Sequence, residues 1–284
     1  MSNFLKRLVE ETPPAHVFEI SKAGIAYSND GQIGFRPFEE DVLNVTPARD
    51  NIQKPLEFNA HVGAIIPKTG KRRPAALILP DFAARVQVLD FDKFPSDPTE
   101  QMALIKFRVR KTVPFDVESA VVSYQAQPSG KRVDVAAAVI ALEIVARYEA
   151  PFRAAGLQPG MVTTSSLAAL NLTPSSGVLI IVKLSGHTMN VMVQDGSRLR
   201  LARTVELEHI DFDDLLAVLY PTIAYIEDEM STRPEKLYLI GHPSIASDLS
   251  RELELPVEPV ESRYGTPGEY NAGLFGYLQG GPSH

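Results

Sequence analysis

A meander of three short strands is predicted twice in this 284-residue sequence, and this repetition limits the possible folds more than any other feature. Residues 16–38 carry the first copy, and residues 178–206 carry the second. Tight turns separate strands within each copy, at Lys22-Ala23 in the first and at Asp195-Gly196 in the second. Each meander is followed by a helix and a further strand. We therefore expect two similar lobes of a duplicated α/β fold.

The residues between the two copies have a different order of predicted elements. A strand at 86–91 precedes a helix at 99–112, and two antiparallel strands then lead into a second helix. This order predicts a small α+β subdomain inserted between the lobes. We expect the first lobe at residues 1–78, the inserted subdomain at 79–158 and the second lobe at 159–284.

Two helices predicted after the second meander have features that affect their packing. Residues 211–230 form a long helix, in which Pro221 should cause a kink or a break. Residues 270–278 form the last helix, which carries small residues such as Gly273 and Gly276 on one face. Small residues allow close packing, so we expect this helix to return to the first lobe.

Composition narrows the class of protein. The net charge of -7 argues against nucleic-acid binding, which usually needs a basic surface. The sequence has no cysteine, which excludes disulfides and thiolate metal sites. No apolar run approaches the roughly 20 residues of a membrane helix. We therefore expect a cytoplasmic protein.

Motif searches provide no sign of a catalytic centre. The sequence contains no GxSxG, P-loop or GxGxxG pattern. Its six histidines lack the spacing of metal ligands. No catalytic residue and no metal site are predicted.

Several segments resemble one protein family. Leu79-Pro80-Asp81 is followed by a strand and a helix that ends at Val113-Pro114-Phe115-Asp116. Later, a strand that ends at Gly241 precedes a helix and the short strand Pro256-Val257-Glu258. This pattern is similar to PilM-like type IV pilus assembly proteins, which belong to the actin-like ATPase superfamily with FtsA and GspL. The resemblance implies an actin-like (ribonuclease H-like) two-lobed fold with an inserted α+β subdomain.

The resemblance also implies a nucleotide site, and this sequence departs from its pattern. Family members have an Asp and a Gly in the first hairpin of each lobe, beside the phosphates and Mg²⁺. The matching residues are Glu19 and Ser21 in the first lobe, and Lys183, Ser185 and Gly186 in the second. A lysine cannot coordinate Mg²⁺, although Lys183 could meet a phosphate directly.

Two further departures weaken the expected nucleotide site. In the adenosine motif Gly241 remains, but His242 stands in place of the second glycine. The helical subdomain that usually covers the cleft is also missing, because the run from Arg203 to Asp211 is short. We expect a pseudo-ATPase without a cofactor, while binding of ATP and Mg²⁺ without hydrolysis stays open.

By resemblance, the function is scaffolding in type IV pilus assembly. PilM-like proteins bind the N-terminal tail of PilN, which links them to PilO and indirectly to the motor ATPase, on the cytoplasmic side of the inner membrane. The expected groove for this tail lies between the first lobe and the inserted subdomain. Its candidate residues are Leu79, Arg85, Val86, Val88, Phe107, Arg108 and Lys111.

Two alternatives remain open from the sequence. The chain could be an active or weakly active actin-like ATPase or phosphotransferase with shifted metal ligands. It could also be a GspL-like type II secretion subunit. Such a subunit normally continues into a membrane helix, whereas this sequence ends at His284 without one, which favours the PilM-like interpretation.

Overall fold

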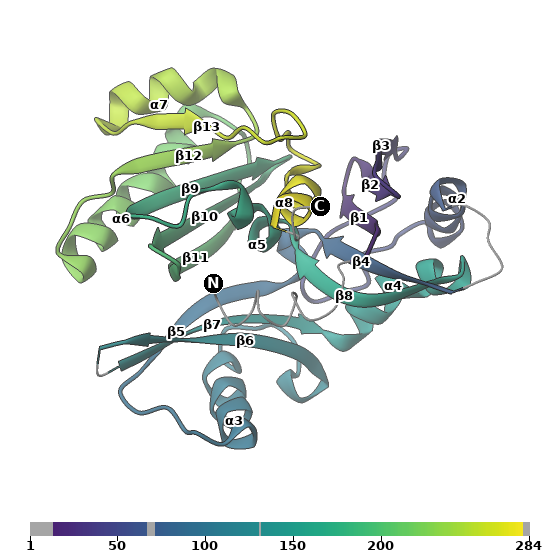
Figure 1. The fold of residues 1–284 in the computed structure, drawn as a ribbon, viewed down its shortest axis with the longest axis horizontal. Helices are drawn as coiled ribbons and strands as arrows, with labels where there is room; N and C mark the ends of the chain where they lie inside the picture. Colours follow the sequence, from purple (N-terminus) through teal and green to yellow (C-terminus); the bar gives the residue numbers. More distant parts are fainter. Residues whose placement is uncertain (1–13, 67–71, 131, 281–284) are drawn as a thin grey trace.

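Two sheets of similar design and a smaller third sheet form the molecule (Figure 1). The computed structural model describes residues 14–66, 72–130 and 132–280. Among these residues, no helix is both long and apolar enough to cross a membrane.

The first sheet has the strand order β3-β2-β1-β4-β8. Strands β1, β2 and β3 form an antiparallel meander, and β4 and β8 extend the sheet in parallel from β1. The bounds are β1 His16–Ser21, β2 Gly24–Asn29, β3 Gln32–Pro37, β4 Arg73–Leu79 and β8 Leu157–Thr164.

The second sheet repeats this design in the order β11-β10-β9-β12-β13. It again begins with an antiparallel meander and continues with two parallel strands. The bounds are β9 Val178–Ser185, β10 Thr188–Asp195, β11 Arg198–Glu206, β12 Lys236–Ile240 and β13 Val257–Pro259. The duplication expected from the two meanders is therefore confirmed.

Helices cover the outer face of each large sheet. Helices α2 (Pro55–Ile65) and α4 (Leu142–Ala154) pack on the first sheet, where Phe18 and Phe152 lie with ring centroids 4.9 Å apart. Helices α6 (Phe212–Met230) and α7 (Ala246–Leu253) pack on the second sheet.

The inner faces of the two sheets meet around two crossing helices, α5 (Ser165–Ala169) and α8 (Ala272–Gly280). The crossing is too close for side chains at some positions. A Cβ atom on Gly276 would lie 2.2 Å from the carbonyl oxygen of Ala168, and one on Gly273 would lie 2.9 Å from the Cα of Ser165. The last helix thus returns to the first lobe, and its small residues allow the close approach.

The inserted subdomain is a three-stranded antiparallel sheet in the order β5-β7-β6. Its elements are β5 (Arg85–Phe91), α3 (Pro98–Val109), β6 (Ala120–Ser129) and β7 (Arg132–Ala141). One face of the sheet packs on α3, and the other face packs against residues of the second lobe.

One expected boundary differs from the structure, and one of two alternatives for a helix is decided. The domain boundary expected at residue 159 falls inside β8, which completes the first sheet, so the second lobe's own sheet begins at β9. Of the kink or break expected at Pro221, the break is absent, because helix α6 is a single element that runs through this residue. Pro221 is exposed, and the next residue, Thr222, donates its hydroxyl to the carbonyl of Val218 at 2.8 Å.

Candidate functional site

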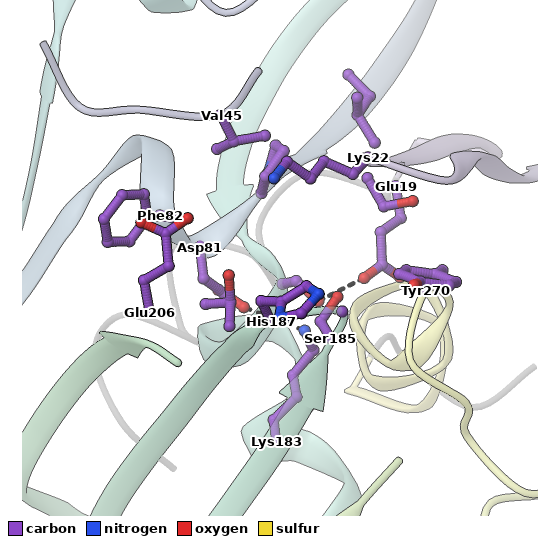
Figure 2. A pocket seen from close by; sticks show the side chains of 16 residues that line it. Glu19, Lys22, Val45, Asp81, Phe82, Lys183, Ser185, His187, Glu206 and Tyr270 are labelled. Atoms are coloured by element: carbon purple, nitrogen blue, oxygen red, sulfur yellow. Dashed lines mark hydrogen bonds and ion pairs between the residues drawn. The ribbon is translucent and has the colours of Figure 1, made fainter. Parts of the chain in front are cut away.

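A narrow cleft lies between the lobes, where the first hairpin of each sheet meets the segment before α8 (Figure 2). The cleft encloses about 50 Å³, whereas pockets for small ligands typically measure about 300–1,000 Å³. The side chains that line it include Glu19, Ser21, Lys22, Asp81, Ser165, Lys183, Ser185, His187, Glu206 and Tyr270.

A buried ion pair crosses the cleft. The Nζ atom of Lys183, on β9, lies 3.1 Å from Oδ2 of Asp81, which directly follows β4 and Pro80. The Lys183 side chain is only 1% exposed and that of Asp81 3% exposed. Because the pair is almost dry, its attraction is much stronger than that of a surface ion pair.

Further hydrogen bonds hold the Asp81 carboxylate in place. Its Oδ1 atom accepts from the backbone N–H of Ser166 at 2.7 Å, at the start of α5. Its Oδ2 atom also accepts from Nδ2 of Asn190 at 2.9 Å, and the amide oxygen of Asn190 accepts from the hydroxyl of Thr204 at 2.8 Å. The carboxylate therefore joins the first lobe to two strands of the second.

Glu19 lies in the same cleft but makes different contacts. It is 1% exposed and accepts hydrogen bonds from the hydroxyl of Ser165 and from the backbone N–H of Leu274, the latter at 2.7 Å. Burial raises the pKa of the Glu19 carboxyl, while the charge of Lys183 acts in the opposite direction. Glu19 thus ties β1 to both crossing helices.

The turns expected to meet phosphates are occupied by groups of the chain itself. The hydroxyl of Ser21 donates to the carbonyl of Gly24 at 3.0 Å, within its own hairpin. The backbone N–H of Gly186, in the second hairpin, donates to Oε2 of Glu269 at 2.9 Å. Ser185 lines the cleft beside it.

Glu269 also reaches the expected adenosine motif. Its Oε1 atom lies 3.3 Å from Nε2 of His242. Gly241 has a φ of 76°, and a Cβ atom there would lie 2.7 Å from the carbonyl oxygen of Leu184. The Glu269 carboxylate therefore bridges the second hairpin and the Gly241-His242 turn.

Asp81 and Glu269 were not predicted from the sequence as cleft residues. Asp81 is 102 positions from Lys183, and Glu269 is 83 positions from Gly186. One signal was present for Asp81, because it follows a buried parallel strand, and polar residues at that end of a strand tend to face a cleft.

The described part of the chain was also compared with the ligand sets that metal ions need. No group of three or more His, Asp or Glu side chains is arranged there to hold an ion.

The seven residues expected to line a peptide groove do not form one surface. Leu79 is buried in the core of the first lobe. Val86 and Val88 pack against the second lobe's side of the inserted sheet, whereas Phe107 lies on α3, on the opposite face. The inserted sheet lies between these two groups. Of the cations, Arg85 lies over the ring of Phe82, and Arg108 and Lys111 lie at the exposed end of α3.

A different surface lies where the inserted subdomain joins the first lobe, at the start of α4. Strand β6 pairs only with β7 among the described strands, so its outer edge has no strand partner. Val121 on β6 is 39% exposed, and Leu142 at the start of α4 is 55% exposed. Since Ala120 pairs with Ala141, these two apolar residues lie at the same end of the β6–β7 hairpin. We call this surface, made of Val121, Leu142 and the outer edge of β6, the β6 edge.

Solved structures of other proteins have the same fold as this chain. No protein-family model and no curated protein matches the sequence. One chain of a PilM-PilN type IV pilus biogenesis complex superposes with a TM-score of 0.70 at 17% identity, over 95% of this chain and 99% of that chain. The cytoplasmic domain of EpsL, an inner-membrane component of the type II secretion system of Vibrio cholerae, superposes with a TM-score of 0.50 at 11% identity, over 79% of this chain and 81% of that one. The chain therefore has the actin-like ATPase fold, in the form seen in the PilM-PilN complex.

Proposed function

We propose that this chain is a scaffold of a type IV pilus assembly complex, which binds the N-terminal tail of a PilN-like protein and does not hydrolyse ATP. The buried pair of Lys183 and Asp81 is the observation that carries the second part of this proposal. The likeness to a chain of the PilM-PilN complex supports the first part.

The ion pair argues against ATP hydrolysis because it disfavours binding of the Mg²⁺ ion that hydrolysis requires. Mg²⁺ requires several oxygen ligands in near-octahedral geometry. Lys183 places an ammonium group where the family has a metal-supporting carboxylate, and that ammonium already neutralises Asp81. A Mg²⁺ ion in this position would face a fixed positive charge.

Glu269 also argues against nucleotide hydrolysis, because it occupies a group that would bind phosphate. A backbone N–H in a hairpin turn is a natural phosphate donor, and that of Gly186 is already bonded to the Glu269 carboxylate. A phosphate would have to displace this carboxylate and would be repelled by it. The small volume of the cleft also argues against a bound nucleotide.

The β6 edge suits an extended peptide. A strand edge offers unpaired N–H and C=O groups to a partner strand, and neighbouring apolar side chains give specificity. Val121 and Leu142 would contact alternate side chains of the bound tail. Bound in this way, the chain would connect a PilN-like protein, its partner PilO and, indirectly, the motor ATPase on the cytoplasmic face of the inner membrane.

Titration with a fluorescent peptide tests this proposal. The peptide is the N-terminal tail of the PilN-like protein from the same organism, and the variants are Val121→Asp and Leu142→Asp. We expect each variant to weaken binding at least tenfold, since a charge is placed in an apolar contact. Leu56→Asp is the matched control, because Leu56 is 85% exposed on α2, outside the β6 edge. Equal affinity of all four proteins would refute binding at this edge.

A further inference from the structure

Helix α3 carries the most exposed phenylalanine that the structure describes. Phe107 is 69% exposed and stands near the C-terminal end of the helix. Lys106, Arg108, Arg110 and Lys111 surround it in sequence, and all but the half-buried Lys106 are exposed. We call Phe107 and these four cations the basic ridge.

The cations of the basic ridge are only partly neutralised. Two of them form ion pairs with Glu118: Nζ of Lys106 lies 3.0 Å from its Oε2 atom, and Nη2 of Arg110 lies 3.3 Å from its Oε1 atom. Nη2 of Arg108 lies 3.4 Å from Oδ1 of Asp90. Four cations thus face two carboxylates, which leaves the ridge positive. These pairs are on the surface, where an ion pair contributes little and another anion can replace one partner.

The basic ridge faces away from the rest of the molecule. Helix α3 covers one face of the inserted sheet, whereas the opposite face packs against the second lobe. In Figure 1 the helix projects from the lower end of the molecule. A projecting aromatic side chain between cations can enter a soft, flat surface without a complementary pocket.

We propose that the basic ridge docks on an anionic lipid surface. The cations would contact lipid phosphates, and the Phe107 ring would enter the boundary between headgroups and acyl chains. The whole chain carries a net charge of -7, so most of its surface would be repelled. Local attraction at the ridge would therefore also orient the molecule, with α3 towards the lipid. This proposal does not depend on the proposed binding of a PilN-like tail.

Co-sedimentation with lipid vesicles tests the proposal on the full chain. One set of vesicles is pure phosphatidylcholine, and the other contains about 30% phosphatidylglycerol, which provides the negative surface charge. We expect binding to the anionic vesicles alone. Binding should be lost when the salt is raised to about 1 M, where the screening length falls to about 3 Å.

Two variants separate the contributions of charge and ring. Lys111→Glu should reduce the partition constant by more than about fivefold, the factor that corresponds to losing one cation near the surface. Phe107→Ser should reduce it to a similar extent without changing the charge. Arg233→Glu and Leu56→Ser are the matched controls, since both residues are strongly exposed outside the ridge, and each should leave vesicle binding unchanged.

Several results would overturn the proposal. These are equal binding to neutral vesicles, no binding to anionic vesicles, or full binding by both ridge variants. If the ridge variants lost affinity for the PilN-like tail and kept vesicle binding, the ridge would be a protein-binding surface and the lipid proposal would fail. Circular dichroism spectra that match the parent protein confirm that each variant is folded. All four substitutions are on the surface, where changes of stability are usually small.

Discussion

At the scale of single residues, Lys183 has the largest effect on the chemistry of this chain. Its ammonium group lies in the cleft between the lobes, paired with Asp81 and almost inaccessible to water. In the nucleotide-binding pattern this position would carry a carboxylate that supports Mg²⁺. In this chain Lys183 instead forms a buried link between the lobes.

Removing one partner of this link should destabilise the fold. Lys183→Met leaves the Asp81 carboxylate buried without its cation, which typically costs about 3–5 kcal/mol. The double variant Lys183→Met, Asp81→Asn should recover a large part of this loss, because the uncompensated charge is gone. Chemical denaturation of the parent, the two single variants and the double variant measures the coupling. Additive single effects would show that the pair does not link the lobes.

The Glu19 carboxyl should make stability depend on pH. Burial raises its pKa in the folded state, so the folded protein binds the proton more tightly than the unfolded chain does. The resulting stabilisation is fully present below the unfolded-state pKa, near 4.5, and is lost as the pH rises through the raised folded-state value.

Glu19→Gln tests this sign. The parent protein should lose more thermal stability than Glu19→Gln between about pH 5 and pH 8, since glutamine does not titrate in this range. Melting temperatures across this range check the expectation. A parent protein that gains stability relative to Glu19→Gln as the pH rises would contradict a raised pKa.

At the scale of elements, the crossing of α5 and α8 holds the two lobes together. Gly276 lies against the backbone of Ala168, and Glu19 accepts a hydrogen bond from the backbone of Leu274 in α8. The sequence predicted close packing of the last helix from its small residues. It could not predict the partner helix, because α5 is short and lies more than one hundred residues earlier in the chain.

Gly276→Ala should destabilise the protein by forcing α5 and α8 apart where they cross. The added methyl group would lie 2.2 Å from a carbonyl oxygen, and overpacking of this kind typically costs about 1–3 kcal/mol. Gly63→Ala in α2 is the matched control, because a Cβ atom there has no neighbour within 4 Å. The control should be neutral or stabilising by up to about 1 kcal/mol. Equal stability of both variants in urea denaturation would contradict close packing at Gly276.

The helices and strands were largely predictable from the sequence, but which part of the molecule covers each of their faces was not. Short apolar runs between turn residues identified most strands of both lobes, and helix α3 was placed within a few residues. The expected peptide groove combined Val88, which faces the second lobe, with Phe107, which projects from α3 on the other side of the sheet. Alternation along a strand shows that two faces exist, but it does not show what covers each face.

At the scale of the whole molecule, the cleft is closed by residues from distant segments. Lys183 and Gly186 were predicted to lie at the cleft from the resemblance to the hairpins of PilM-like proteins. Their partners, Asp81 and Glu269, come from other parts of the chain and depend on how the lobes are placed. The sequence therefore indicated two of the cleft residues, whereas their partners are seen only in the structure.

This arrangement has a consequence for partner binding. The contacts of Asp81, Glu19 and Glu269 hold the lobes together with groups of the chain itself. In the proposed scaffold, no nucleotide is needed to organise the β6 edge, so its affinity for a partner should not depend on ATP.

Titration of the PilN-like tail peptide with and without Mg·ATP tests this account most directly. We predict binding in nucleotide-free buffer, with the same affinity after ATP and Mg²⁺ are added at millimolar concentration, and no release of phosphate. Binding that requires Mg·ATP, or an affinity that changes more than a few fold when it is added, would contradict the account.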